Sequence, residues 1–432
     1  MSYDDLDTSI GRLKKAAIDA WMADDGFYED KLGTNYYYKW GFAPNGYEMP
    51  DSSGEGGGKV DGMPWDDDIS FDGIRSRVDS AADKWRNLPT GSSAGTYKTS
   101  TSSAAASLGA SGSGASVADD GAIMTSTNTM GDLLNQQLVA SFIGPMLDKY
   151  YTQFKGVSQS LGAASAILQM NYTMQSSMWD GVRKDVASIF ENAESACSEY
   201  AKSKAAASIQ ITLGVVATVA SAVATVATAG AAAPLVGTMV TLSSAASTAV
   251  AAISADASIS GGSYDEIMSS FEESLETLRT AVSDQESEVR TMLSGAVNAV
   301  MGDPSGFDLD RYQITPQSDN FSDEIVMVRQ HTNTVSSNMQ RVIDGLDAAK
   351  SALGSPPYSD PTPHDSRISS GTHASAFSLY EATADALAST LLEYSRGKEL
   401  FDAEVENYFN TDAENQRLVE QLAASEALTP NS

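Results

Sequence analysis

The sequence predicts an all-α protein, an elongated bundle of long antiparallel helices, and three observations lead to this prediction. Apolar residues recur at alternating steps of four and three over long stretches, which is the a/d spacing of coiled coils. Segments rich in Gly and Pro, which end helices, separate these stretches. The chain has 432 residues, enough to bury a sizeable core between several helices.

Residues 1–90 form a segment that differs from the rest of the chain. It holds four of the five tryptophans: Trp21, Trp40, Trp65 and Trp85. Their neighbours are Gly, Pro and Asp, so we expect an irregular segment of short helices and turns laid against the bundle. Within it, residues 74–88 have a helical spacing of apolar groups, and Pro89 would end that helix.

Residues 91–122 are rich in Ser, Gly and Thr and poor in apolar groups. This composition predicts a flexible linker or a long loop. In residues 123–204 an apolar stripe returns at helical spacing, is interrupted at Trp179 and Gly181, and resumes at Val182. We therefore expect a helical hairpin here. Gly181 would permit the tight backbone reversal, and Trp179 would cap the seam where the two helices part.

Residues 205–255 contain no charged residue. A break from Gly230 to Pro234 divides them into two apolar pieces, each near the ~20 residues that span a bilayer. One interpretation is a helical hairpin buried among the other helices, which we expect in the resting soluble form. The other is a conditional membrane hairpin, because small residues allow close packing of helices in lipid. Both interpretations hold if the protein changes conformation and releases the hairpin from between the other helices.

Residues 256–303 predict one long amphipathic helix. Its apolar stripe follows the heptad spacing from Tyr264 to Ala296. The segment GDPSGFD, which contains Pro304, would end this helix and lead to the last part of the chain.

Residues 321–425 predict a C-terminal helical hairpin around the Pro-rich loop GSPPYSDPTPHD. The first arm carries the a/d spacing from Phe321 through Ile325 to Leu353, and the second carries it from Phe377 to Tyr408. We expect the two seams to close antiparallel on each other or on a partner pair of helices.

The charge of the chain restricts its partners. A formal net charge of −30 excludes nucleic acid, whose phosphates require clustered Lys and Arg, and favours basic or apolar partners. The first residues, MSYDDLDTSIGRLKK, are acidic and lack an apolar core, so we expect no general secretory signal peptide. The single cysteine, Cys197, leaves the chain without an intramolecular disulfide.

Enzyme chemistry has little support in the sequence. The three histidines, His331, His364 and His373, lack the spacing of metal ligands. Cys197 has no basic neighbour that would activate its thiol, and no phosphate-binding glycine loop is present. We expect a non-enzymatic protein with no cofactor and no metal.

Two short motifs resemble those of a known family. Trp179-Asp180-Gly181 resembles the W-x-G turn of the WXG/ESX family of type VII secretion substrates. The stretch YFNTD, from Tyr408 to Asp412, resembles the Y-x-x-x-D/E export signal of that family. Residues 371–416 are similar to the C-terminal helix of its EspC-like branch. The resemblance covers residues 124–200 and 321–416, about two fifths of the chain.

The resemblance implies a substrate of a type VII, ESX-like secretion system in a Gram-positive cell. It implies that the folded bundle is exported to the cell surface or medium, with Tyr408 and Asp412 as the signal read by the secretion machinery. A partner helical protein or self-association would be in keeping with the family. The chain departs from the family in its length, in its uncharged insert, and in carrying the motifs on separate hairpins. These departures favour a larger, effector-like or structural substrate.

Two alternatives stay open. The 205–255 segment would make the protein a membrane-inserting or pore-forming helical protein, with Gly230 and Pro234 at the turn of the inserted hairpin. A non-secreted, cytoplasmic coiled-coil scaffold would instead use its seams to bind partner helices.

Overall fold

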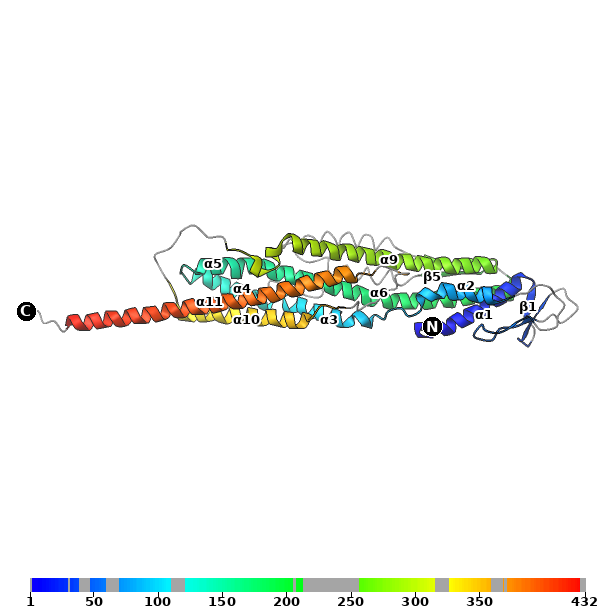
Figure 1. The fold of residues 1–432 in the computed structure, drawn as a ribbon, viewed down its shortest axis with the longest axis horizontal. Helices are drawn as coiled ribbons and strands as arrows, with labels where there is room; N and C mark the ends of the chain where they lie inside the picture. The colour runs from blue at the N-terminus through cyan, green and yellow to red at the C-terminus, as the bar shows by residue number, and fades with distance from the viewer. Residues whose placement is uncertain are drawn as a thin grey trace, which may run out of the picture.

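Long helices account for most of the protein in the computed structural model, and the predicted all-α class is confirmed. The structure describes residues 2–29, 32–38, 47–59, 70–109, 121–204, 207–212, 256–314, 326–358, 368 and 371–427. The helices run along one long axis (Figure 1). They are α1 (Leu6–Asp24), α2 (Asp72–Ala82), α3 (Ser92–Ser107), α4 (Ala122–Gln136), α5 (Ile143–Leu147), α6 (Phe154–Ser203), α9 (Tyr264–Gly302), α10 (Arg329–Leu353) and α11 (His373–Ala427).

The strands are short and antiparallel. One sheet lies at the end of the molecule near α1 and has the order β1-β2-β3-β4, with β1 (Phe27–Glu29), β2 (Asn35–Tyr38), β3 (Tyr47–Glu48) and β4 (Gly58–Lys59). The second sheet pairs β5 (Ala207–Thr212) with β6 (Asp256–Gly261).

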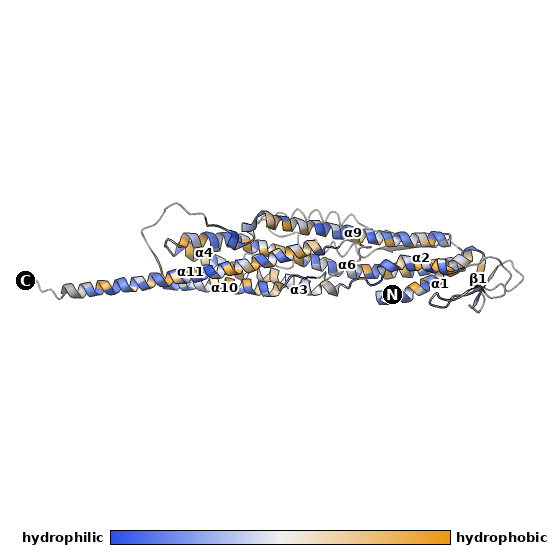
Figure 2. Ribbon diagram, in the orientation of Figure 1, coloured by the Kyte–Doolittle hydropathy of each residue, from blue (hydrophilic) through white to orange (hydrophobic). Residues whose placement is uncertain are grey.

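Helix α6 is the centre of the core. It contacts α1, α3, α9 and α11. Phe190 of α6 and Phe271 of α9 meet edge to face, with ring centroids 5.0 Å apart, and both rings are fully buried. Figure 2 shows hydrophilic and hydrophobic residues alternating along the helices, as expected where each helix buries one face.

The predicted C-terminal hairpin is present. Helices α10 and α11 lie antiparallel and in contact (Figure 1). The predicted seam of α10 is buried at Val335, Met339, Val342 and Leu346. However, α10 begins only at Arg329, because Val326 forms a β-bridge with Val139 and Val328 has an extended backbone. Phe321 and Ile325 lie outside the described residues.

The interpretation of residues 91–122 as a linker is wrong for its first half, which forms α3. Tertiary packing outweighs the low helix propensity of Ser and Thr here. Ala94, Ala104 and Leu108 are fully buried, and small residues let α3 lie close to α6 and α10. Tyr97 of α3 contacts the ring of Tyr172 at a centroid distance of 5.5 Å. Residues 110–120 are not described.

The N-terminal segment is more regular than predicted. Helix α1 has 19 residues and packs on α6 through buried Ile10, Leu13 and Ala17. Four alanines, at 16, 17, 20 and 23, share its buried face with larger apolar residues, which weakens the periodic signal in the sequence. The predicted helix at 74–88 is confirmed as α2 with a 3₁₀ turn after it.

The uncharged segment begins as a strand, not as a helix. Residues 207–212 form β5, where β-branched Ile209 and Ile211 suit a strand. Thr212 pairs with Asp256, so the chain enters and leaves the segment at neighbouring positions. Gly230 and Pro234 lie outside the described residues. Among the residues that are described, no helix is long and apolar enough to cross a membrane. The predicted 256–303 helix correspondingly starts at Tyr264, after β6.

Candidate functional site: the projecting arm of helix α11

The last part of α11 projects beyond the other helices (Figure 1). Phe401 is the last fully buried residue among those of α11 whose side chains are described, up to residue 421, and we call residues 402–427 the α11 arm. Tyr408 is half-buried and Asp412 is exposed. The two lie one turn apart, so they share one face of the helix. The arm therefore presents both predicted signal residues away from the core.

The base of the arm is fixed by two aromatic contacts. Phe401 packs edge to face on Phe142 with ring centroids 6.0 Å apart. Further along, the guanidinium carbon of Arg329 lies 4.2 Å from the ring centroid of Phe409. This is a cation–π contact. Phe409 in turn meets the ring of Tyr408 edge to face at 5.4 Å.

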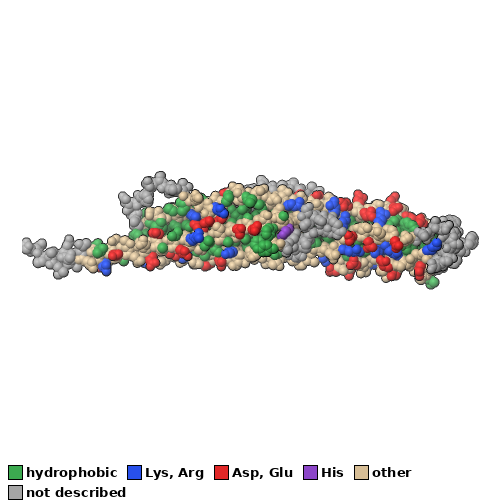
Figure 3. Space-filling model, in the orientation of Figure 1, with side chains coloured by type: hydrophobic (Ala, Val, Ile, Leu, Met, Phe, Trp, Pro, Cys, Tyr) green, Lys and Arg blue, Asp and Glu red, His purple; other side chains and the backbone are tan. Residues whose placement is uncertain are grey.

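The arm is strongly acidic. Lys398 pairs with Asp402 at 2.6 Å just where the arm begins. Beyond this pair, acidic residues outnumber basic ones: Glu404, Glu406, Asp412, Glu414, Glu420 and Glu426 against Arg417. Figure 3 shows carboxylate groups spread along the visible face of both bundle and arm. Such a surface is suited to a partner that is basic or that buries the apolar side chains of the arm.

The interpretation of Trp179 and Gly181 as a turn is wrong, because α6 runs through both without a break. The buried residues Met174, Met178 and Val182 continue at steps of four through the tripeptide, so the apolar face of the helix is not interrupted.

Trp179 is instead part of a buried polar network. Its Nε1 donates to Gln175 Oε1 at 2.9 Å, and Gln175 Nε2 donates to Thr372 Oγ1 at 3.1 Å. Thr372 Oγ1 donates to Asn171 Oδ1 at 2.9 Å. Thr372 directly precedes α11, so Trp179 helps to hold the start of that helix. Tyr408 lies roughly 50 Å further along α11 at ~1.5 Å per residue. The structure does not bring the two motifs together.

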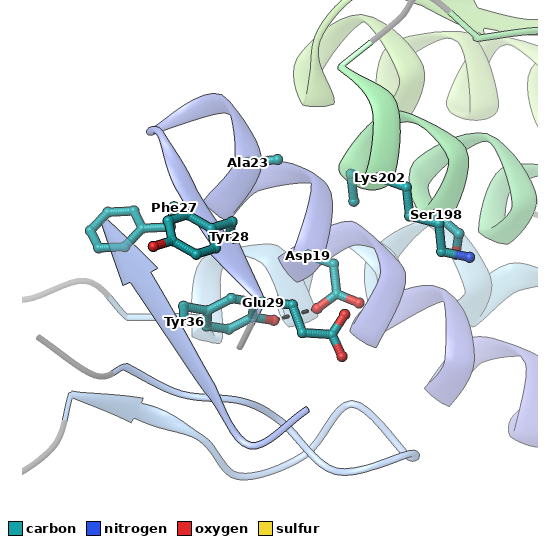
Figure 4. A pocket seen from close by; sticks show the side chains of 9 residues that line it. Asp19, Ala23, Phe27, Tyr28, Glu29, Tyr36, Ser198 and Lys202 are labelled. Carbon is teal, nitrogen blue, oxygen red and sulfur yellow. Dashed lines mark hydrogen bonds between the residues drawn. The ribbon is translucent and has the colours of Figure 1, made fainter. Parts of the chain in front are cut away.

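A cavity of 280 Å³ lies between α1, β1, β2 and the end of α6. Its central group, Asp19, is already engaged: it accepts from the Tyr36 hydroxyl, and Lys15 Nζ lies 2.9 Å from its other oxygen. The rings of Phe27 and Tyr28 point away from Asp19 (Figure 4). Burial, with the Asp19 charge beside it, raises the pKa of Tyr36. The Tyr36 hydroxyl and the Asp19 and Glu29 carboxylates lie together on one side of the cavity, where Tyr36 and Lys15 already occupy both oxygens of Asp19 (Figure 4).

The remaining candidate groups for chemistry lie apart from one another. Cys197 is fully buried, and burial raises the pKa of its thiol to about 12. His373 opens α11 with its ring 5.9 Å from Phe377, His331 lies on α10, and His364 is outside the described residues. No group of three or more His, Cys, Asp or Glu within the described residues is placed to hold a metal ion.

Comparison of the chain with known protein families, curated proteins and solved structures finds no match. The α11 arm is therefore a candidate site on the positions and contacts of its residues alone. The contact of Arg329 with the arm was not predicted from the sequence, because the apolar spacing placed Arg329 inside a longer helix starting at Phe321. Phe409 lies within the YFNTD motif, but its contact with Arg329 joins residues far apart in the chain.

Proposed function

We propose that the protein is a secreted, non-enzymatic substrate of a type VII, ESX-like secretion system, with the α11 arm as its export signal. The observation that carries this proposal is the position of Tyr408 and Asp412 on one face of a helix that leaves the bundle. A receptor could reach that face without unfolding the core. The W-x-G resemblance no longer contributes, because Trp179 and Gly181 lie inside a continuous helix.

The packing of the hairpin supports export as a folded unit. The seam of α10 is filled by α3, α4 and α11 of the same chain. The acidic arm would remain available for a basic or apolar surface of the secretion machinery. This arrangement favours an effector-like or structural cargo that reaches the cell surface or medium by a signal-peptide-independent route.

The test is culture fractionation of a tagged protein in its native host. We expect Tyr408→Ala, and separately Asp412→Ala, to lower the secreted fraction about tenfold or more, as loss of a central contact residue does at interfaces. Tyr358→Ala is the matched control, since Tyr358 is 88% exposed but lies outside the arm. Undiminished export of Tyr408→Ala would overturn the proposal. A wild type that stays in the cytoplasm would favour the scaffold alternative.

A second candidate function is action at a membrane after export. The pairing of β5 with β6 places the two ends of the uncharged segment side by side, as a hairpin inserted from one side requires. We expect the wild type to float with phosphatidylcholine vesicles and release an enclosed dye, and a variant lacking residues 213–255 to do neither. Absence of lipid binding at every pH and salt concentration would remove this candidate.

A further inference from the structure

The start of helix α10 is held rigidly at the point where the α11 arm leaves the bundle. Val326 and Val139 exchange two backbone hydrogen bonds of 2.8 and 2.9 Å. The backbone N–H of Thr332 donates to Val328 O at 3.0 Å, and its buried hydroxyl donates to Arg329 O at 3.0 Å. The backbone of Arg329 is thus fixed from both sides before its side chain makes any contact.

Around the start of the arm, α11 contacts the bundle at three successive residues: Phe401, partly buried Val405 and Phe409. Phe401 packs on Phe142, which belongs to the same α4–α5 connection as Val139. Two helical turns further on, Arg329 lies over the ring of Phe409. Because α11 is one continuous helix, its packing up to Phe401 already sets the direction in which the arm leaves the bundle. The contact at Phe409, roughly 12 Å beyond Phe401 along the axis, restrains bending and fraying of the first turns of the arm.

Tyr408 and Asp412 lie beside the face of α11 on which Phe409 contacts Arg329. At about 100° per residue, Tyr408 lies about 100° round the helix from Phe409, and Asp412, three residues on, lies about 60° round on the same side. Asp412 is exposed, and the edge of Tyr408 rests on the clamped Phe409 ring. Arg329 therefore influences the position of Tyr408 through its contact with Phe409.

We propose that Arg329 is a positioning residue for the export signal: it holds Phe409 and so presents Tyr408 and Asp412 in one fixed orientation. This inference rests on the function proposed above. Arg329 acts before the partner arrives, by reducing the conformational freedom that binding would otherwise remove. Arg suits this role because its flat guanidinium group stacks on an aromatic ring.

The experiment uses the full-length protein and two measurements, secreted fraction and amide hydrogen exchange of residues 402–416. We expect Arg329→Gln to lower export about two- to fivefold, the factor that corresponds to a cation–π contact at an exposed site. Exchange in the arm should become faster. Phe409→Leu should lower export at least as much, because it removes the Tyr408 ring contact as well as the Arg329 contact, and adding Arg329→Gln to it should cause no further loss. Arg341→Gln is the control: it removes an equal charge from α10, where Arg341 contacts Asn338 of the same helix.

The outcomes separate the two proposals. If Tyr408→Ala abolishes export while Arg329→Gln exports normally, the positioning role is wrong and the export signal stands. If Arg329→Gln lowers export but leaves exchange in the arm unchanged, Arg329 does not position the arm and the inference is overturned. An additive double variant would also overturn it. If Tyr408→Ala exports normally, the proposed function fails and positioning for export fails with it.

Discussion

At the scale of single residues, burial decides which side chains are chemically available. Cys197 lies on α6 in the core and has no exposed surface. Burial disfavours the thiolate and raises the pKa of the thiol from 9.0 to about 12. Reactive cysteines are exposed and have a lowered pKa, so this thiol behaves as a small apolar core residue.

Native Cys197 should therefore resist alkylation. With iodoacetamide at pH 8 we expect almost no modification of the folded protein and complete modification in denaturant, measured by intact mass. The raised pKa keeps the folded thiol protonated up to about pH 12, while the unfolded thiol ionises near 9.0. Rapid labelling of the folded protein at pH 8 would contradict this assignment.

The pKa of the Asp79 carboxyl group is lowered, in contrast with the raised pKa of the Cys197 thiol. Burial raises the pKa of its carboxyl group, but hydrogen bonds from Lys14 and Arg86 outweigh burial and lower it overall. Lys14 Nζ lies 2.9 Å from Asp79 Oδ2, and Arg86 Nη2 donates to Oδ1 at 3.0 Å. These ion pairs join α1 to α2 and the turn after it.

A lowered carboxyl pKa stabilises the fold above the ordinary value of 3.8, and this contribution is lost as the pH falls through the folded value. We expect Asp79→Asn to reduce the free energy of unfolding at pH 7 by ~0.5–1 kcal/mol, allowing for solvent screening of a partly exposed pair. The difference should shrink below pH 3.8. Denaturant titrations at pH 7 and at a pH below 3.8 measure the difference in the free energy of unfolding between Asp79→Asn and the wild type. Asp347→Asn, at an exposed position, is the control. An equal difference at both pH values would rule out this linkage.

At the scale of elements, a π-helical turn fixes α11 against the segment that leads into α6. This turn, Asp148–Gln153, directs both Lys149 and Tyr150 at Glu393 of α11. Lys149 Nζ lies 2.6 Å from Glu393 Oε1, and the Tyr150 hydroxyl donates to the same oxygen at 2.9 Å. One helical turn beyond Glu393, Gly397 provides the space that the Tyr150 ring occupies.

A side chain at position 397 should disturb this contact. In Gly397→Ala the new Cβ would meet the Tyr150 ring, which is buried and held by Glu393. We expect a loss of ~1–3 kcal/mol in the free energy of unfolding. Gly156→Ala is the matched control on α6, where a Cβ meets nothing within 4 Å, and it should stabilise by up to ~1 kcal/mol. Thermal or denaturant unfolding compares the two variants, and equal effects would refute the close contact.

At the scale of the whole molecule, the bundle and the arm differ in burial. Beyond Phe401 no described side chain of α11 is fully buried. The arm therefore contributes little to the core, and its described side chains are open to a partner. Stability and export should respond to different parts of the protein.

Removal of residues 404–432 should change the free energy of unfolding by ~1 kcal/mol or less, because the side chains of residues 404–421 are exposed or half-buried. Export should be abolished, since Tyr408 and Asp412 are gone. Removal of residues 418–432 is the control, because it keeps both signal residues and the Arg329 contact. Unfolding curves and culture fractionation give the two measurements. A truncated protein that unfolds much more easily would show that the arm belongs to the core.

The sequence by itself determined the elements whose apolar spacing is long and regular. The α10–α11 hairpin, α9 and the helix at 74–88 follow from that spacing, because a continuous apolar face must be buried whatever its neighbours are. The positions of Tyr408 and Asp412 on one exposed helical face follow from their separation by one turn.

Only the tertiary structure decided that residues 92–107 form α3, that α6 is continuous, and that Arg329 contacts the arm at Phe409. The Ser- and Thr-rich residues 92–107 are helical because α6 and α10 cover their small apolar face. Trp179 and Gly181 do not form a turn, since the packing around α6 continues on both sides of them. Arg329 reaches Phe409 only when α10 and α11 lie antiparallel. In each case the stabilising contacts join residues far apart in the chain, and the spacing of apolar residues along the chain does not predict such contacts.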